Sequence, residues 1–220
     1  MRRENSDSSV FPARSAIKNW TGLMTRDEKI AKKNAEIYND PQLNRVRRKE
    51  RAVTDDAWIK ALLRRGAFGT IATIAGEQPF MNAHNYVYDE ERNCIYFHRN
   101  PVGRTSANLE RNPRVCYQVA EMGRMYSGKS AQNFGVEYRS VIIFGTARLV
   151  DLEEAAHALR LLMEKYAPHL EFGVDYEGFN PHCPQDAAVY RVDIESWSGK
   201  ANEVADDRPG LYDYDQVREE

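Results

Sequence analysis

The residues best suited to hold a ligand lie where a predicted strand runs into a predicted helix, and the chain there reads FHRNPVGRTS over residues 97–106. Arg104, Thr105 and Ser106 stand in the first helical turn, whose free backbone N–H groups and dipole favour an anion. A guanidinium, two hydroxyls and backbone amides form a donor set that suits a phosphate monoester. The same spacing also fits a helix that Thr105 simply caps, beside a solvated Arg104, and the residues alone leave both interpretations open.

No catalytic set of the hydrolase type accompanies this segment. The chain contains no GxSxG, no HExxH, no GxGxxG after a strand and no paired carboxylates in an apolar setting. Cys94, Cys116 and Cys183 are too far apart for a disulfide framework, and His182 beside Cys183 lacks a second ligand pair at zinc spacing. We therefore expect no metal site, and we expect any enzymatic reactivity to come from an organic cofactor.

Composition narrows the class of protein. With 42% hydrophobic residues among 220, the chain can bury a sizeable core, so we expect a globular protein. No stretch approaches the roughly 18 apolar residues of a membrane helix, and the first twenty residues lack the apolar centre of a secretory signal. These features predict a cytoplasmic protein without a membrane partner.

Charge is distributed unevenly along the chain. Residues 1–51 hold 13 Lys and Arg against 7 Asp and Glu, whereas the remainder holds 18 against 26. The basic run RVRRKER at residues 45–51 has no interleaved aromatics, so a solvated arm is favoured over nucleic-acid binding. We divide the chain into a basic arm with one helix (1–50), a central domain (51–202) and an acidic tail (203–220).

The periodicity of apolar residues predicts helices at the flanks and strands in the middle. Thr25 and Glu28 form a capping box for a helix that ends near Asn39, and Asp151 caps the clearest helix of the chain. The other helices are predicted after Asp55 and over 104–111, the strands over 67–74, 80–88, 94–98, 114–120, 138–150 and 189–194, and a long loop over 121–137. The first three strands read as a meander. The pattern indicates a mainly β fold with flanking helices (α+β), an antiparallel barrel rather than a doubly wound sheet.

Four motifs in this order carry a family resemblance: FHRNPVGR, NPRVCYQV, YRSVIIFGTARL and ESWSGK. They resemble the FMN-binding split barrels related to pyridoxamine 5'-phosphate oxidase, most closely the nitroimidazole-resistance (NimA-like) branch, over about residues 48–200. The resemblance implies a six-stranded antiparallel split β-barrel of the FMN-binding type. It also implies FMN as the cofactor and a homodimer with flavin sites at the subunit interface.

The resemblance assigns roles to single residues. It implies that Arg104 and Thr105 grip the FMN phosphate, that Ser140 faces the flavin or its phosphate, and that Trp197 and Lys200 close over the cofactor. A barrel-edge aromatic and a surface lysine are the structural alternatives for the last two. His98 corresponds to a histidine in the active-site groove, where it would contact the cofactor and act as the catalytic residue, although a packing role at the strand end is the alternative.

One strand departs from the pattern of these relatives. In these relatives the strand that holds Asn82, His84 and Asn85 usually lines the flavin ring, so the resemblance implies that these residues contact the cofactor. His84 stands where relatives commonly have proline. An imidazole at this position either changes the substrate or the reactivity of the protein, or faces solvent at the edge of the sheet. We also find no arginine and histidine motif for pyridoxal phosphate after Trp197.

These observations favour an FMN-dependent oxidoreductase that reduces a small planar acceptor such as a nitroimidazole, with a bound small-molecule acceptor as its other partner. The alternatives are a flavin- or haem-binding protein without turnover and an enzyme like pyridoxamine 5'-phosphate oxidase. A phosphate site favours FMN over haem, which carries carboxylates instead of a phosphate. Haem stays open as an alternative because His84 or His98 could be an axial ligand of its iron.

Overall fold

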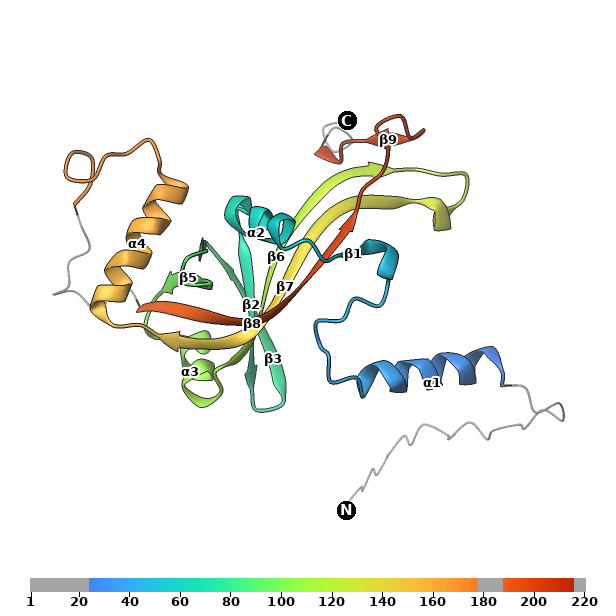
Figure 1. Ribbon diagram of the computed structural model, residues 1–220, viewed down its shortest axis with the longest axis horizontal. Coiled ribbons are helices and arrows are strands. Elements are labelled where there is room, and N and C mark those ends of the chain that lie inside the picture. The colour runs from blue at the N-terminus through green and yellow to red at the C-terminus, as the bar shows by residue number, and fades with distance from the viewer. Residues whose placement is uncertain (1–23, 178–187, 216–220) are drawn as a thin grey trace, which may run out of the picture. The chain divides into compact units, whose positions relative to one another are not determined.

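The computed structural model describes residues 24–177 and 188–215 (Figure 1). The chain divides into two units between Leu43 and Asn44. The dipeptide His182-Cys183, weighed above as a metal ligand pair, lies outside the described residues. In the part that is described, no helix is both long enough and apolar enough to cross a membrane.

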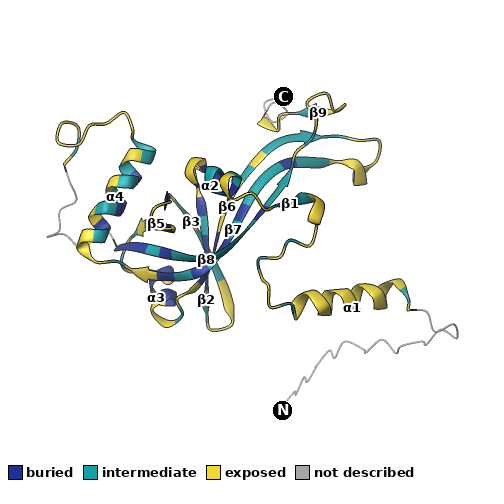
Figure 2. Cartoon of the chain, in the orientation of Figure 1, coloured by how far each residue is buried: buried dark blue, intermediate teal, exposed yellow. Residues whose placement is uncertain are grey.

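The first unit contains α1 (Arg26–Tyr38), and its start confirms the predicted capping box. The Glu28 backbone N–H donates to Thr25 Oγ1 at 3.2 Å, and the Thr25 N–H donates to the Glu28 carboxylate at 2.8 Å. No residue of α1 is buried, and Figure 2 shows the helix exposed along its length. The capping box therefore fixes where this helix begins without any help from a core.

The second unit contains one antiparallel sheet of nine strands. The strands are β1 (Ala52–Val53), β2 (Gly69–Ala75), β3 (Gln78–His84), β4 (Val87–Asp89), β5 (Cys94–Arg99), β6 (Arg114–Tyr126), β7 (Gly135–Leu149), β8 (Ala188–Asn202) and β9 (Leu211–Tyr212). Along the sheet the order is β3-β2-β6-β7-β8-β5-β4, with β1 beside β8 and β9 beside β6. Six of the strands have six or more residues, which agrees with the predicted six-stranded sheet.

The sheet curls into a barrel that stays open. His84 on β3 and Phe97 on β5 stack with ring centroids 4.2 Å apart, although four strands separate β3 from β5 in the sheet order. No ladder joins β3 to β4, the two ends of that order, among the described strands. The predicted fold class, mainly β with flanking helices in a split-barrel arrangement, is confirmed.

The interior of the barrel is filled by alternate strand side chains and by two helices. Phe97, Tyr117 and Ile143 are fully buried there, and α2 (Asp56–Arg65) adds Ile59, Leu62 and Leu63. The Asp55 carboxylate caps α2 by accepting from the Ala57 N–H at 2.9 Å. The short helix α3 (Arg104–Arg111) contributes Leu109 to the same core. α3 packs against β2 and follows β5 after a loop of four residues, and the candidate site lies at this junction.

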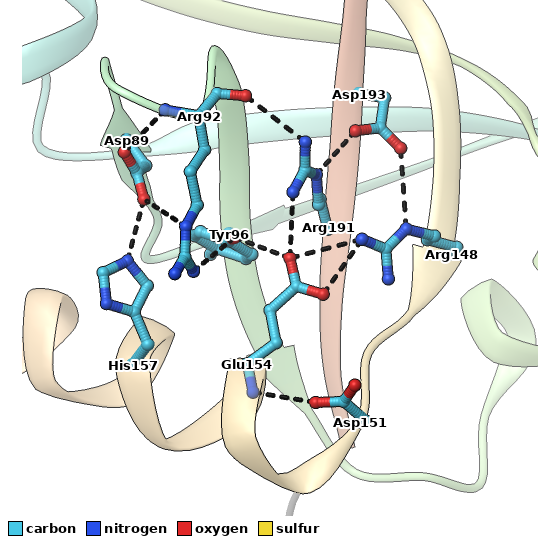
Figure 3. Close-up of polar contacts among 9 residues, drawn as sticks. All are labelled: Asp89, Arg92, Tyr96, Arg148, Asp151, Glu154, His157, Arg191 and Asp193. Carbon is cyan, nitrogen blue, oxygen red and sulfur yellow. Dashed lines mark hydrogen bonds and ion pairs between the residues drawn. The ribbon is translucent and has the colours of Figure 1, made fainter.

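The last helix, α4 (Leu152–Tyr166), covers the outer face of β4, β5 and β8. Ala155, Ala158 and Leu162 face the sheet and pack on Cys94 and Tyr96 of β5. As predicted, Asp151 caps the helix, accepting from the Glu154 N–H at 2.8 Å. A network of charged side chains around Glu154 ties the first turns of α4 to β5, β7 and β8 (Figure 3). Both faces of β5 are therefore covered, one by the barrel core and one by α4.

The predicted loop over residues 121–137 is wrong. The strand β6 continues to Tyr126 and β7 begins at Gly135, so the two form a long hairpin with a register shift between Met122 and Met125. In the part of this hairpin that the prediction missed, residues 121–126 and 135–137, most residues are half-exposed (Figure 2), so the period-2 signal of a one-sided strand is missing. Likewise β8 extends to Asn202, beyond the predicted end at Ile194, and Leu211 and Tyr212 of the acidic tail pair with β6.

The predicted meander of the first three strands is also wrong. The second predicted strand breaks between His84 and Val87, and its two parts lie at opposite ends of the sheet order as β3 and β4. Tyr86 in the break is fully buried, and its hydroxyl donates to the Leu63 carbonyl at 2.7 Å. The buried Tyr86 side chain therefore fixes the point where the chain passes from β3 to β4. This passage depends on tertiary packing, which the local sequence pattern does not show.

Candidate functional site

The N-terminus of α3 carries no side-chain cap. Its N-cap residue is Gly103, and no side chain in the described structure accepts from the first-turn N–H groups. The first intrahelical bond runs from the Ala107 N–H to the Gly103 carbonyl at 3.0 Å. Free N–H groups and the positive end of the helix dipole therefore meet at the end of the loop that follows β5.

Two buried hydroxyls stand in the same turn without partners. Thr105 is 0% exposed and Ser106 is 2% exposed, and within the described residues neither side-chain oxygen makes a hydrogen bond. Leaving a buried hydroxyl unpaired costs about 1–3 kcal/mol, so such groups are uncommon in a folded core. By contrast Thr73, at a similar depth, accepts from the Asn108 side-chain amide at 2.9 Å. The turn therefore has unused hydrogen-bonding capacity.

Arg99 brings an uncompensated positive charge to this turn. Its side chain packs against Gly103, where an added Cβ would lie 2.7 Å from Nη2. Its Nη1 is buried and has no partner in the described part of the chain, and no carboxylate pairs with it there. Burial lowers the pKa of the guanidinium, which records how poorly the site compensates this charge. An anion beside Gly103 would supply the missing partner.

His84 lies on the interior face of β3, close to the same charge. Its ring stacks on Phe97 and lies 5.6 Å from the Tyr117 ring, with Nδ1 3.4 Å from the Tyr117 hydroxyl. Burial lowers the pKa of His84 to about 4, and electrostatic interactions with the neighbouring Arg99 and His98 add to this shift. The imidazole is therefore neutral at pH 7, and its buried Nε2 has no partner among the described residues.

The other predicted residues of this half of the site surround the turn. His98 is exposed on the outer face of β5, opposite the buried Phe97, as strand alternation requires. Arg104 is exposed and, with Arg111, lines a cavity of about 560 Å³ between α3 and the β2–β3 turn. Asn82 is half-buried on the same face of β3 as His84, and Asn85 is exposed just after that strand.

The remaining predicted residues form a second group on β7 and β8. Ser140 Oγ donates to the Lys200 carbonyl at 3.3 Å, and Lys200 Nζ lies 5.5 Å from the centre of the Tyr138 ring. Trp197 Nε1 donates to Asp56 Oδ1 at 2.9 Å. All three predicted residues are half-buried. These contacts lie within the chain, and none of them reaches α3.

The two groups lie far apart along one strand. His98 pairs with Val189 near the start of β8, and Ser140 pairs with Lys200 near its end. Eleven residues of strand separate these positions, a path of about 36 Å at about 3.3 Å per residue. The structure therefore brings His84, His98 and Thr105 into one region and Ser140 and Lys200 into another, without joining them in a single chain.

A family model described as pyridoxamine 5'-phosphate oxidase matches residues 55–201. The chain belongs to this family. The match contains both groups of residues described above, the one at α3 and the one on β7 and β8. No curated protein matches the chain.

Solved structures support the fold of this family. The flavocytochrome Anf3 from Azotobacter vinelandii has a TM-score of 0.64 at 22% identity, covering 80% of this chain and 78% of its own. The FAD and haem binding protein from Mycobacterium smegmatis has a TM-score of 0.64 at 15% identity, covering 74% and 83%. A candidate 5-nitroimidazole antibiotic resistance protein from Bacteroides thetaiotaomicron has 0.56 at 21% identity, covering 69% and 90%. The fold is thus one that flavin-binding and haem-binding proteins share.

Within this family domain, sequence reasoning did not assign a role to Arg99. Strand alternation could have identified this residue. Arg99 shares the interior face of β5 with Ile95 and Phe97, and an arginine is unusual on a buried face unless it has an acidic partner. Only the fold shows that no carboxylate among the described residues pairs with it. Ser106 was recognised as a hydroxyl of the first turn, but its lack of a partner could be known only from the packing around it.

Proposed function

We propose that the chain binds FMN and acts as a homodimeric flavin oxidoreductase that reduces a small planar acceptor such as a nitro compound. The observation that carries this proposal is the donor set at α3 that has no partners among the described residues: the buried Thr105 and Ser106 hydroxyls, the buried Arg99 Nη1 and the uncapped helix N-terminus. These groups fit a phosphate monoester in charge and in number of donors. Family membership and the flavin-binding solved relatives support the same cofactor class.

The chain's own residues would hold and orient the cofactor. Arg99, Thr105 and Ser106 hold the phosphate, with Arg104 adding positive charge from the exposed side of α3. A bound flavin supplies the electron transfer that no side chain of the protein can provide. The neutral His84 offers one unpaired ring nitrogen as a hydrogen-bonding group. His98, which is exposed, would give a proton to the reduced acceptor.

A second subunit would complete the site. Ser140 and Lys200 lie about 36 Å along β8 from the position that pairs with His98, and no described contact joins them to α3. A two-fold axis places the same surface of each subunit opposite the other, so the partner subunit's Ser140 and the partner subunit's Lys200 can face α3. We therefore propose two equivalent flavin sites in a dimer, each using both groups of residues.

The test compares FMN with riboflavin, which lacks the phosphate. Replacing Arg99 with Gln, or Arg104 with Ala, should raise the Kd for FMN at least about tenfold, the effect of losing one charge-assisted contact, and leave riboflavin nearly unchanged. Arg160→Gln, at an exposed position on α4, serves as the charge-matched control. Equal losses for FMN and riboflavin would show that neither arginine holds the phosphate.

A second candidate function is binding of a planar cofactor, flavin or haem, without turnover. One observation favours haem: the neutral His84 ring keeps a buried nitrogen without a partner in the described structure, as a ligand of haem iron would. Two of the solved relatives, a flavocytochrome and a FAD and haem binding protein, are described as binding haem or containing a cytochrome. A Soret band after haem titration that is lost in His84→Ala would support this candidate, and a flavin spectrum with acceptor reduction would exclude a purely non-catalytic role.

A further inference from the structure

A cavity in the described part of the chain lies away from α3. It has a volume of about 720 Å³ and is lined by the tip of the β6–β7 hairpin and by two segments that flank the family domain. Arg48 and Arg51 come from the segment before β1, which includes the 3-10 turn η1 (Lys49–Arg51), and Arg208 comes from the tail after β8. The family match begins at residue 55 and ends at 201, so the cationic wall is an addition to the domain.

The charge of this cavity is one-sided. Its lining includes three arginines and no aspartate or glutamate. Arg48 pairs with Glu50 at 2.6 Å, but within the described residues neither Arg51 nor Arg208 has a carboxylate partner. Arg208 instead lies over the Tyr126 ring, 3.8 Å from its centre. Among the described residues, the cavity therefore contains two arginines that form no ion pair with a carboxylate, although Glu50 interacts electrostatically with Arg51.

Two tyrosine rings that line the cavity, those of Tyr138 and Tyr126, lie beside Arg51 and Arg208. Arg51 Nη1 donates to the Tyr138 hydroxyl at 3.3 Å, and Lys200 Nζ lies near the same ring from the other strand. Burial raises the pKa of Tyr138, but the hydrogen bonds from Arg51 and Lys200 lower it by more, so the net shift is downward. The field at this hydroxyl favours negative charge, and a bound anion would feel the same field.

The cavity is held in shape by ion pairs and by close packing. Arg124 Nε lies 2.8 Å from Glu137 across the hairpin, and Arg124 Nη2 lies 2.8 Å from Asp206 of the tail. The tail is fixed further by the Ser127 N–H, which donates to the Gly210 carbonyl at 2.8 Å. Tyr126 packs against Gly135, where a Cβ would lie only 2.2 Å from its hydroxyl. Arg208 is thus presented from an anchored segment.

We propose that this cavity binds a phosphorylated ligand of nucleotide size. Arg51 and Arg208 would hold the phosphates, while the tyrosine rings and the side-chain amides of Gln132 and Asn133 would contact a planar base. Its volume lies within the range of about 300–1,000 Å³ typical of small-molecule sites. The cavity lies beside the group on β7 and β8, because Lys200 approaches the Tyr138 ring in its lining. Its two arginines, Arg51 and Arg208, belong to neither half of the proposed flavin site, so the proposal does not depend on flavin binding.

The test uses adenosine 5'-diphosphate as the probe, titrated calorimetrically into the full-length protein with and without excess FMN. We expect binding in both cases, with adenosine and inorganic phosphate each at least about tenfold weaker. Arg51→Gln and Arg208→Gln should each raise the Kd for the probe at least about tenfold while leaving the Kd for FMN unchanged. Arg47→Gln removes the same charge from an exposed neighbour that does not line the cavity, and it should stay within about twofold of the parent.

Three results would overturn the proposal. The first is no binding of the probe at millimolar concentration by the correctly folded parent. The second is equal weakening by Arg47→Gln and Arg51→Gln, which would show only general attraction to a basic arm. The third is competition between the probe and FMN, or loss of FMN in Arg51→Gln, which would assign the cavity to the flavin site. Failure of the flavin proposal alone would leave probe binding intact, so the two proposals fail separately.

Discussion

Arg191 on β8 and Glu154 on α4 form an ion pair at the boundary between the helix and the sheet, with Nη1 3.0 Å from Oε1 and side chains only 19% and 15% exposed. The same carboxylate accepts from the Tyr96 hydroxyl at 2.7 Å and from Arg148 at 2.9 Å (Figure 3). Burial alone would raise the pKa of Glu154, but the hydrogen bonds from these three donors outweigh burial, so the pKa is lowered to about 2. Glu154 is therefore ionised at neutral pH.

Replacing Glu154 with Gln should lower the free energy of unfolding by about 3 kcal/mol at pH 7, because two cations lose their buried partner. Glu164→Gln, whose ion pair with Arg160 is exposed, should cost no more than about 0.5 kcal/mol. Urea denaturation of the two variants measures both values. Similar small losses in both would show that the network does not hold α4 to the sheet.

The same carboxylate predicts a pH dependence. Its pKa is lower in the folded state than the usual 4.5, so the unfolded chain binds the proton first as the pH falls. The stabilisation is complete above pH 4.5 and is lost as the pH falls towards 2. The stability difference between the parent and Glu154→Gln should accordingly shrink over this interval. A difference that stays constant from pH 6 to pH 3 would contradict the assignment.

Thr105→Val should stabilise the protein without ligand while weakening FMN. The substitution keeps the shape and removes a buried hydroxyl that has no partner in the described structure, so we expect a gain of about 1 kcal/mol. Thr73→Val removes a hydroxyl that accepts from Asn108, and it should lose about 1–2 kcal/mol. Thermal unfolding with and without FMN separates the two effects. A loss of stability in Thr105→Val would mean that its hydroxyl has a structural partner.

Local signals in the sequence located the helices well. The boundaries of α3 match the prediction, and Thr25, Asp55 and Asp151 all cap as expected, because a cap is decided by neighbours within four residues. The strands of the barrel were found where one face is buried. The outer part of the β6–β7 hairpin, residues 121–126 and 135–137, was missed because most of its residues are half-exposed, which erases the alternation on which the prediction depended.

The candidate site was predictable only in part. Thr105 and the helix N-terminus could be recognised from spacing, since both belong to one turn. The unpaired state of Arg99, the neutral ring of His84 against Phe97 and the distance between His98 and Lys200 all depend on strands that are remote in sequence. No local pattern encodes the absence of a carboxylate partner. That information exists only once the sheet has curled.

His98→Ala should keep the fold and most FMN affinity, because the side chain is exposed and none of its contacts holds the core. If His98 gives the proton to the acceptor, turnover of a nitro compound should fall by about 10²-fold, the usual scale for a general acid. His169→Ala, at an exposed position after α4, is the matched control. Turnover at the parent rate from pH 5 to pH 8 would make His98 a bystander, and loss of FMN would move it to cofactor binding.

The shared site predicts complementation between two defective subunits. Arg99→Gln damages the α3 half, and Lys200→Gln damages the half on β7 and β8, so each homodimer should lose both flavin sites. In a heterodimer with one subunit of each kind, one site collects both defects and the other has none. Because the intact halves then meet across the interface, the heterodimer should bind one FMN at the concentration where both homodimers are empty.

Differently tagged subunits, coexpressed and purified on both tags, provide this heterodimer, and flavin absorbance per dimer gives the stoichiometry. Light scattering must first show a dimer; a mass near the 25.3 kDa of one chain, with flavin bound, would refute the shared site at once. If the heterodimer is as empty as the homodimers, Arg99 and Lys200 act within one chain on one ligand. That outcome would conflict with their separation along β8, and the position of Lys200 relative to the flavin would have to be revised.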